Sequence, residues 1–304
     1  MAAIADDRRL DPRVKWALRN VPVTALGDVD SRERLLEISN SPKAIALRDK
    51  MEALYDTLDT EQVASSTGLT ITTHDVVSAP DANTIKVRFV RPESDETLPC
   101  VYYIHGGGMQ NGSAFGAMYR VWARVLAAQG VAVAMIDFRN CVTPSSVPEV
   151  EPFPAGLNDC VSGLRWLVSQ AGVLGVDAER IVVAAKAAEA LWTAHRPRWI
   201  LSAGFCGGLV GGLARGDIVV AERIVVAGES GGGNLTLATG MRLLRDGDIS
   251  IVSGLYALCP YIAGGWPQDR FPSSVENEGI LLNLHHNRGA IAYGIEHFEA
   301  ANPL

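Results

Sequence analysis

The sequence lacks several features that would assign it to a class at once. It has no run near the roughly 20 apolar residues of a membrane-spanning helix. Its opening segment, 1–9, carries acids early and no apolar stretch, which predicts that no secretory signal is present. Positive charge is in the minority, with 27 Lys and Arg against 34 Asp and Glu. We therefore expect a cytoplasmic protein that has no membrane span and does not bind nucleic acid.

Cysteine is also scarce, and the spacing of the cysteines does not match a metal-binding motif. The five cysteines are odd in number, and no two have the C-x-x-C spacing of a metal or redox motif. We expect buried thiols in a reducing compartment, with no disulfide framework and no metal. The cysteines are Cys100, Cys141, Cys160, Cys206 and Cys259.

The chain divides by pattern into a helical beginning and an α/β remainder. Residues 1–65 are charged and helical in character, with Asp11 and Pro12 as a strong helix start and an amphipathic stretch from Ser31 to Leu54. Two β-branched segments, 70–77 and 84–90, follow with a turn cluster between them, which predicts a hairpin. Residues 66–304 are therefore expected to form the core.

Later strands are short apolar runs without alternation, which is typical of strands buried on both faces of a parallel sheet. Helical segments such as Ala117–Gln129 and Pro154–Gln170 lie between them. This alternation predicts an α/β fold with a mostly parallel, doubly wound sheet and helices on both faces. The apolar runs are 99–104, 131–136, 180–184, 223–227 and 254–258.

One segment of the sequence occurs twice. Ala178–Ala184 reads Ala-Glu-Arg-Ile-Val-Val-Ala and recurs as Ala221–Ala227, 43 residues later. One duplication is too little for a repeat protein. We interpret about 177–219, and 185–219 in particular, as an insertion or gene-model artefact that loops off the sheet. The alternative is a real extra strand and helix.

The second copy runs directly into a candidate nucleophile. Gly228-Glu229-Ser230-Gly231-Gly232 follows a buried strand and precedes a helical pattern. A serine on a tight strand-to-helix turn has its Oγ lifted out of the sheet, and small neighbours let strand and helix pass closely. A dinucleotide loop is the competing interpretation. It fails because its last glycine position is Thr236, so we expect no cofactor.

A glycine-rich loop follows an earlier strand. His105-Gly106-Gly107-Gly108 comes directly after Val101–Ile104. Consecutive glycines let backbone N–H groups turn toward a substrate carbonyl. With the N–H of Gly231, those of Gly106 and Gly107 would form an oxyanion hole, in which each donor contributes roughly 3 kcal/mol. The two motifs together are far more specific than either alone.

These motifs resemble the hormone-sensitive-lipase-like carboxylesterases, which have an α/β-hydrolase fold. The resemblance includes Asp137-Phe138-Arg139-Asn140, Glu151–Cys160 and Ala257–Ile262. It implies hydrolysis of short-to-medium acyl esters, with residues 1–65 as cap helices over the acyl pocket. It also implies that His105 orients the glycine loop and is not the catalytic base.

A serine nucleophile of this kind needs a general base and an acid, in the order Ser, Asp or Glu, His. The family places both after the next strand, and we expect neither within a chain that ends at Leu304. The resemblance therefore implies truncation, with the last strands missing and the strand at Gly254–Leu258 left as an exposed edge. Such an edge predicts aggregation or self-association. Weak substitutes are His285, His286, His297, Asp269, Glu276 and Glu278.

Three hypotheses remain open at this point. The first is a serine carboxylesterase that uses Ser230 on a small-molecule ester. The second is a non-catalytic small-molecule-binding homologue on the same scaffold. The third is an incomplete gene product without independent function.

Overall fold

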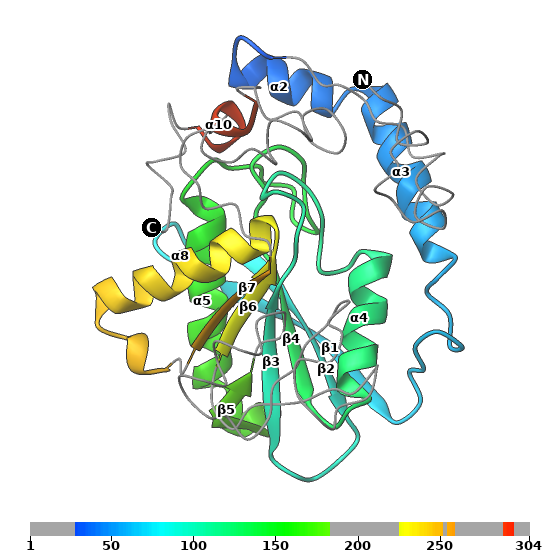
Figure 1. The fold of residues 1–304 in the computed structure, drawn as a ribbon, viewed down its shortest axis with the longest axis vertical. Helices are drawn as coiled ribbons and strands as arrows, with labels where there is room; N and C mark the ends of the chain where they lie inside the picture. Colours follow the sequence, from blue (N-terminus) through cyan, green and yellow to red (C-terminus); the bar gives the residue numbers. More distant parts are fainter. Residues whose placement is uncertain (1–27, 183–224, 252–253, 259–287, 295–304) are drawn as a thin grey trace, which may run out of the picture.

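The computed structural model describes residues 28–182, 225–251, 254–258 and 288–294. Its central feature is a seven-stranded sheet in the order β1-β2-β4-β3-β6-β7, with β5 also paired to β3 (Figure 1). β1, β2 and β4 pair antiparallel, and the remaining pairs are parallel. The strands are β1 (Leu69–Val77), β2 (Thr84–Pro92), β3 (Leu98–Ile104), β4 (Ala132–Asp137), β5 (Val176–Val182), β6 (Val225–Glu229) and β7 (Gly254–Leu258).

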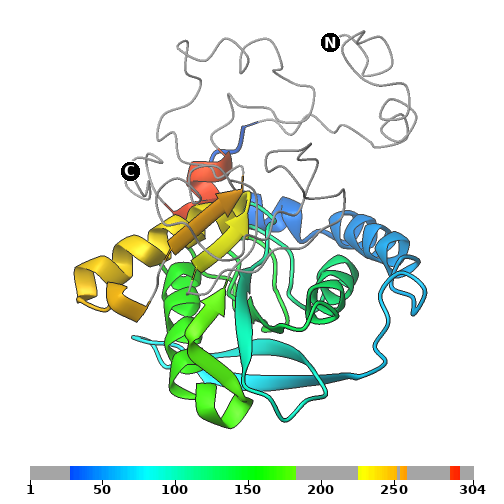
Figure 2. The ribbon, with the colours of Figure 1, turned by 60° about the horizontal axis from the view of Figure 1, so that its bottom comes forward.

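Helices lie on both faces of this sheet and beyond one end of it. α4 lies on one face, α5 and α8 lie on the other, and α2, α3 and α10 lie beyond the sheet (Figures 1 and 2). Among the described residues, no helix is long and apolar enough to cross a membrane. The helices are α2 (Arg32–Ser39), α3 (Pro42–Asp56), α4 (Ala117–Ala127), α5 (Ala155–Ser169), α6 (Ala171–Leu174), α8 (Gly231–Asp246) and α10 (Arg288–Tyr293), with a 3₁₀ turn at Ile249–Ile251.

Burial on both faces explains why the central strands read as continuous apolar runs. In β3, Tyr102 and Ile104 pack into the core under α5 and α8. Val101 and Tyr103 point the other way, into the core under α4. Successive strand side chains alternate between faces, so both sets must be apolar when both faces are covered. The predicted α/β fold, with a mostly parallel sheet covered by helices on both faces, is thereby confirmed.

The predicted hairpin is confirmed, because β1 and β2 pair antiparallel from Leu69 opposite Pro92 to Val77 opposite Thr84. The stretch predicted from Ser31 to Leu54 is two helices rather than one. The break falls at Ser41, whose side chain accepts a hydrogen bond from the Ala44 N–H and so caps α3. The expected helix start at 11–12 lies outside the described residues.

Both copies of the duplicated segment contribute to the sheet. The first copy enters it as β5, which pairs with β3 at Cys100 and Val101. The second copy enters as β6, which pairs with β3 at Tyr103 and Ile104. Residues 177–182 are therefore part of a strand, and the insertion predicted from about 177 does not loop off the sheet there. Residues 183–224 lie outside the described part of the chain.

The cysteines that the structure describes are free and buried, as predicted. Burial raises the pKa of the Cys141 thiol to about 12 and also raises the pKa of Cys100 and Cys160. Thiols with such pKa values are protonated at neutral pH and therefore react slowly. Cys206 and Cys259 lie outside the described residues.

A buried ion pair fixes the chain just after β4. The backbone N–H and Nε of Arg139 both donate to Oδ2 of Asp159 at 2.9 Å, and Nη2 donates to Oδ1 at 2.7 Å. Nη1 donates to Asp81 at 2.6 Å. Burial lowers the pKa of the Arg139 guanidinium, but its hydrogen bonds to the two carboxylates outweigh burial and raise that pKa. This pair joins β4, α5 and the β1–β2 turn.

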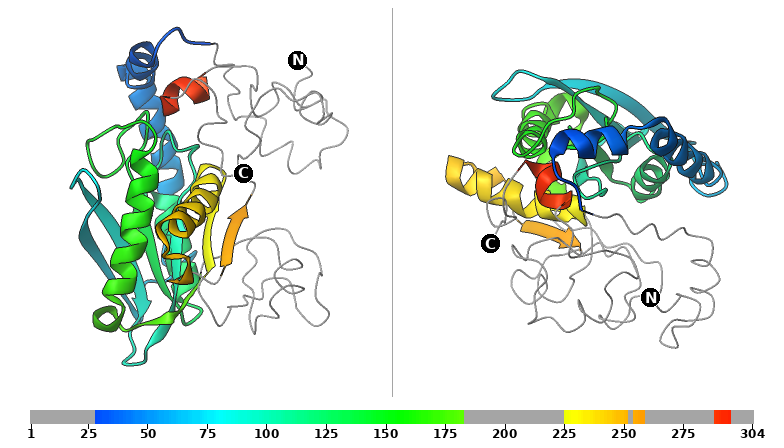
Figure 3. Two further views of the ribbon diagram at one scale, coloured as in Figure 1. Left: turned by 90° about the vertical axis from the view of Figure 1, so that its left-hand side faces the viewer. Right: turned by 90° about the horizontal axis from the view of Figure 1, so that it is seen from above.

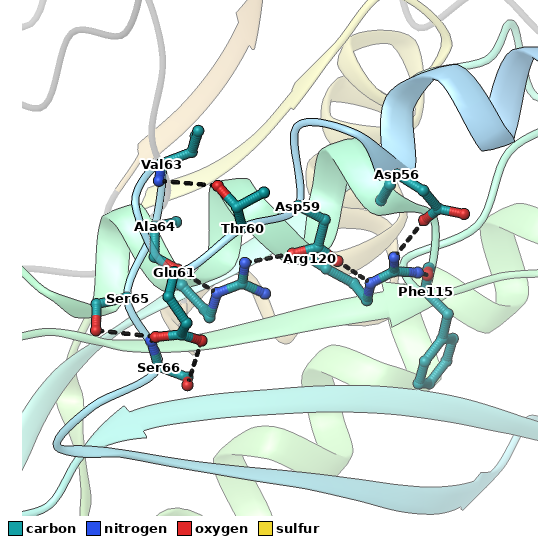
Figure 4. Close-up of polar contacts among 12 residues, drawn as sticks. Asp56, Asp59, Thr60, Glu61, Val63, Ala64, Ser65, Ser66, Phe115 and Arg120 are labelled. Atoms are coloured by element: carbon teal, nitrogen blue, oxygen red, sulfur yellow. Dashed lines mark hydrogen bonds and ion pairs between the residues drawn. The ribbon is translucent and has the colours of Figure 1, made fainter.

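A second charged cluster holds the end of α3 against α4 (Figure 4). Arg120 donates to Asp56 and Asp59 at 2.6 Å, and Arg124 also pairs with Asp59. Glu52 accepts a 2.6 Å hydrogen bond from the Ala117 N–H, which satisfies a free backbone donor at the start of α4. The attachment of α3 to the core is thus largely polar.

Replacing Asp159 with Asn should lower the free energy of unfolding by about 3–5 kcal/mol, because the buried Arg139 guanidinium loses its buried carboxylate and keeps only the more exposed Asp81. Urea unfolding measures this loss. The matched control is Asp75→Asn, which breaks the exposed pair with Lys86 and should cost much less. Equal losses of unfolding free energy in the two variants would show that burial does not increase the contribution of the Arg139–Asp159 pair to stability.

Candidate active site

Ser230 occupies the turn between β6 and α8. Its backbone has φ of 51° and ψ of -117°, a left-handed φ that is rare for a residue with a side chain. Ser230 is exposed and stands at the N-cap of α8, where its hydroxyl makes no capping hydrogen bond. A strained backbone with an exposed, uncommitted hydroxyl is the geometry expected of a nucleophile at a strand-to-helix turn.

The turn fits because the two residues after Ser230 have no side chain. A Cβ on Gly231 would lie 2.5 Å from the backbone nitrogen of Met109, and one on Gly232 would lie 2.3 Å from the carbonyl oxygen of Ile104. Both distances are shorter than real Cβ contacts. The start of α8 therefore lies directly against the loop that follows β3, which brings the two predicted motifs together.

That loop has an unusual backbone conformation. Gly107, Gly108 and Met109 have φ values of 107°, 63° and 62°. The Gly107 carbonyl accepts hydrogen bonds from the N–H groups of Gln110 and Asn111. Within the described part of the chain, the N–H groups of Gly107, Gly108 and Gly231 donate no hydrogen bond. These donors lie at the contact between the loop and the Ser230 turn, where an oxyanion could be bound.

The backbone N–H of Gly106 has a partner inside the protein. It donates a 2.9 Å hydrogen bond to the hydroxyl oxygen of Tyr119, on α4. This donor is therefore used inside the protein, and its role in an oxyanion hole stays a prediction. No spacing in the sequence indicated Tyr119, because its role depends on how α4 packs against the loop.

His105 is buried behind the loop, as expected of a residue that orients it. Its ring stacks on Phe138 with centroids 4.2 Å apart, and its Nδ1 lies 2.8 Å from the carbonyl oxygen of Gly106. Only 1% of its side chain is exposed, which argues against a role as a base for external protons. The role of His105 in orienting the loop stays a prediction.

Asp137 ties the glycine loop to the segment after β4. Its buried carboxylate accepts hydrogen bonds from the N–H groups of Ala114, at 2.6 Å, and Ser146, at 2.7 Å. The side chain of Asn140 donates to the carbonyl of Gly112 at 2.8 Å. These contacts join two loops at the carboxyl ends of β3 and β4, so the glycine loop is held from its far side.

α2 and α10 lie side by side over this end of the sheet (Figures 1 and 3). Arg32, at the start of α2, donates to the carbonyl oxygens of Cys141, at 2.6 Å, and Ala292, at 2.7 Å. Asn40 donates to the carbonyl of Val142 at 2.9 Å. The N-terminal helices are thereby fixed to the loops that surround the candidate site, where the cap was expected.

The described residues do not supply a base for Ser230. Their histidines are His105, which is buried behind the loop, and His74. His74 lies on β1, separated from β6 by three strands, and contacts Thr72 and Trp166. The other candidate bases and acids, His285, His286, His297, Asp269, Glu276 and Glu278, lie outside the described residues, as does His195. Within the described chain, no cluster of His, Cys, Asp and Glu could hold a metal ion.

Comparison with known proteins supports the assignment of the fold. Residues 101–298 match the family described as alpha/beta hydrolase fold. The structure of esterase Est22 superposes with a TM-score of 0.77 at 46% identity, over 96% of this chain and 73% of that one. Brefeldin A esterase, a bacterial homologue of human hormone-sensitive lipase, superposes with a TM-score of 0.66 at 26% identity, over 96% and 68% of the two chains.

Curated relatives agree with the structures. Carboxylesterase NlhH of Mycobacterium tuberculosis is 31% identical over 183 residues, which make up 59% of this chain and 48% of that protein. The chain spans about half the length of the curated relatives that it matches. Together these similarities confirm the predicted resemblance to hormone-sensitive-lipase-like esterases.

Replacing Gly232 with Ala should destabilise the protein by about 1–3 kcal/mol, because its Cβ would overlap the Ile104 carbonyl. It should also slow the reaction of Ser230 with a fluorophosphonate. Thermal unfolding and labelling rates measure the two effects. Gly172→Ala is the control, since a Cβ there meets nothing within 4 Å. If the two variants behave alike, the close contact between α8 and the loop is not needed.

Replacing Tyr119 with Phe should leave the Gly106 N–H without its acceptor and loosen the glycine loop, at a cost of about 1–3 kcal/mol. Labelling of Ser230 should slow, by less than the roughly 100-fold expected on losing an oxyanion donor itself. Tyr55→Phe, a change on α3, serves as the control. Unchanged stability and labelling in Tyr119→Phe would argue that the hydrogen bond has no role.

Proposed function

The chain belongs to the α/β-hydrolase fold family, and we propose that it is a serine carboxylesterase that acts on short-to-medium acyl esters. The observation that carries the proposal is the contact between the Ser230 turn and the glycine loop. It brings the proposed nucleophile and the proposed backbone donors together at one end of the sheet. The esterases that the chain resembles in sequence and structure support the same reaction class.

In the proposed reaction, Ser230 Oγ attacks the ester carbonyl carbon and passes its proton to a general base. The carbonyl oxygen becomes an oxyanion, for which the N–H groups of Gly107, Gly108 and Gly231 are the proposed donors. Collapse of the tetrahedral intermediate expels the alcohol and leaves an acyl-serine. Water then attacks the acyl group and releases the carboxylic acid, which regenerates the hydroxyl.

Two features of the turn favour this chemistry. Ser230 precedes a helix of 16 residues, whose N-terminal end carries partial positive charge. That end stabilises negative charge that develops beside it. Ser230 is also exposed and has a left-handed φ, as expected of a nucleophile on a strand-to-helix turn.

The described residues contain no suitable general base for the proposed reaction. His105 is an unsuitable base, because its ring is buried and stacked on Phe138. A serine with no base retains only the modest rate that binding and an oxyanion hole supply. A homologue without a base could still bind small molecules in the same place, and the experiment below separates the two functions.

A cytoplasmic location is part of the proposal. The thiols of Cys100, Cys141 and Cys160 are free and buried, which supports a reducing compartment. In oxidising compartments, such as those that secreted proteins enter, cysteines tend to form disulfides. The proposed partner is a small-molecule ester. Self-association through β7, the last strand in the described sheet, stays a prediction.

Ser230→Ala should abolish hydrolysis of p-nitrophenyl acetate and remove covalent labelling by a fluorophosphonate, because both need the Oγ nucleophile. Release of p-nitrophenol and intact-protein mass report the two results. Ser169→Ala, which changes an exposed serine at the end of α5, is the matched control. Tight binding of an ester analogue without hydrolysis or labelling of the parent chain would overturn the esterase and favour the small-molecule binder.

A further inference from the structure

We propose that the two copies of Ala-Glu-Arg-Ile-Val-Val-Ala share a single strand position beside β3, and that residues 182–224 are a removable insertion within that strand. The copies are Ala178–Ala184 and Ala221–Ala227, identical at all seven positions and 43 residues apart. The proposal rests on how each copy pairs with β3.

Both copies pair with the same edge of β3. The opposite edge is occupied by β4, which pairs in parallel from Cys100 to Ile104. β5 covers the amino-terminal half of the remaining edge, at Leu98, Cys100 and Val101. β6 covers the carboxyl-terminal half, at Tyr103 and Ile104. Two strand segments therefore cover one edge of β3, whereas the single strand β4 covers the other edge.

The registers of the two segments agree. Ile181 lies opposite Cys100, and parallel strands advance one residue for one residue, so the position opposite Tyr103 corresponds to residue 184 of the first copy. The residue actually found opposite Tyr103 is Ala227, which is the equivalent of residue 184 in the second copy. An unrelated segment would match this register only by chance.

Removal of 182–224 would therefore join the two half-strands without any change of register. Ile181 would be followed directly by Val225, and the sequence would read Ala-Glu-Arg-Ile-Val-Val-Ala-Gly-Glu-Ser. The resulting strand would run along β3 from Cys100 to Ile104 and continue into Ser230. The deletion would also avoid the loss of chain entropy that closure of a long loop costs.

Identity of the copies has a consequence for the candidate site. The second copy alone continues into Gly228, Glu229 and Ser230. If the first copy filled the position as far as Tyr103, it would displace the strand that delivers the nucleophile. Occupation of the carboxyl-terminal half by the second copy is thus what assembles the Ser230 turn.

The test compares two deletions in the full chain. Deletion of 182–224 keeps the register, whereas deletion of 183–224 leaves one additional valine and shifts the strand by one residue. A one-residue slip turns every side chain to the opposite face. We expect deletion of 182–224 to fold with a melting temperature at or above that of the full chain. Deletion of 183–224 should melt about 5 °C or more below it.

Two results would overturn the proposal. One is equal melting temperatures for the two deletions, which would mean that register is irrelevant. The other is loss of cooperative unfolding, or a lower melting temperature than the full chain, when 182–224 is deleted. Because melting does not depend on catalysis, failure of the esterase proposal would leave this test intact. Fluorophosphonate labelling of the register-preserving deletion gives a second readout, which should be at least as fast as in the full chain.

Discussion

The absence of side chains at Gly231 and Gly232 is the constraint on which the site depends. The start of α8 and the loop after β3 lie so close that one methyl group at either position would overlap backbone atoms of the loop. Backbone atoms cannot be moved aside as a flexible side chain can. The contact therefore sets the position of Ser230 relative to the glycine loop, and it couples two segments that are more than 100 residues apart in the sequence.

Polar contacts around this constraint hold the surrounding loops in place. Asp137 accepts hydrogen bonds from two loops, and Arg139 joins α5 to the β1–β2 turn through Asp159 and Asp81. Tyr119 uses its hydroxyl to accept from the glycine loop. Buried polar groups of this kind are costly unless satisfied, so each contact favours one arrangement of the loops over others.

Much of the fold was predictable, because the composition of each strand indicates which of its faces are buried. The apolar runs around Val101 and Val133 identify strands that are covered on both faces, and the alternation in 84–90 identifies a hairpin strand. The two motifs around Ser230 and His105 identify the elements of the site. Pairing of distant motifs is predictable only where both have a recognisable pattern.

The rest was not predictable, for physical reasons. The use of the Gly106 N–H by Tyr119 depends on the packing of α4, which local sequence does not encode. The placement of β5 in the sheet depends on which edge of β3 is vacant, and that is a property of the whole sheet. The division of the stretch from Ser31 to Leu54 was available in Ser41 and Pro42, a capping signal within an amphipathic pattern.

The attachment of α3 has a consequence for cooperativity. None of its residues is buried, and Leu47 and Leu54 are 49% and 57% exposed. It is held to α4 mainly through Glu52, Asp56 and the neighbouring Asp59. Detachment of such a helix exposes little new apolar surface, so it opens at a lower free energy than the sheet. Amide hydrogens of α3 would then exchange with solvent by local opening, whereas those of β3 and β4 would exchange only through global unfolding.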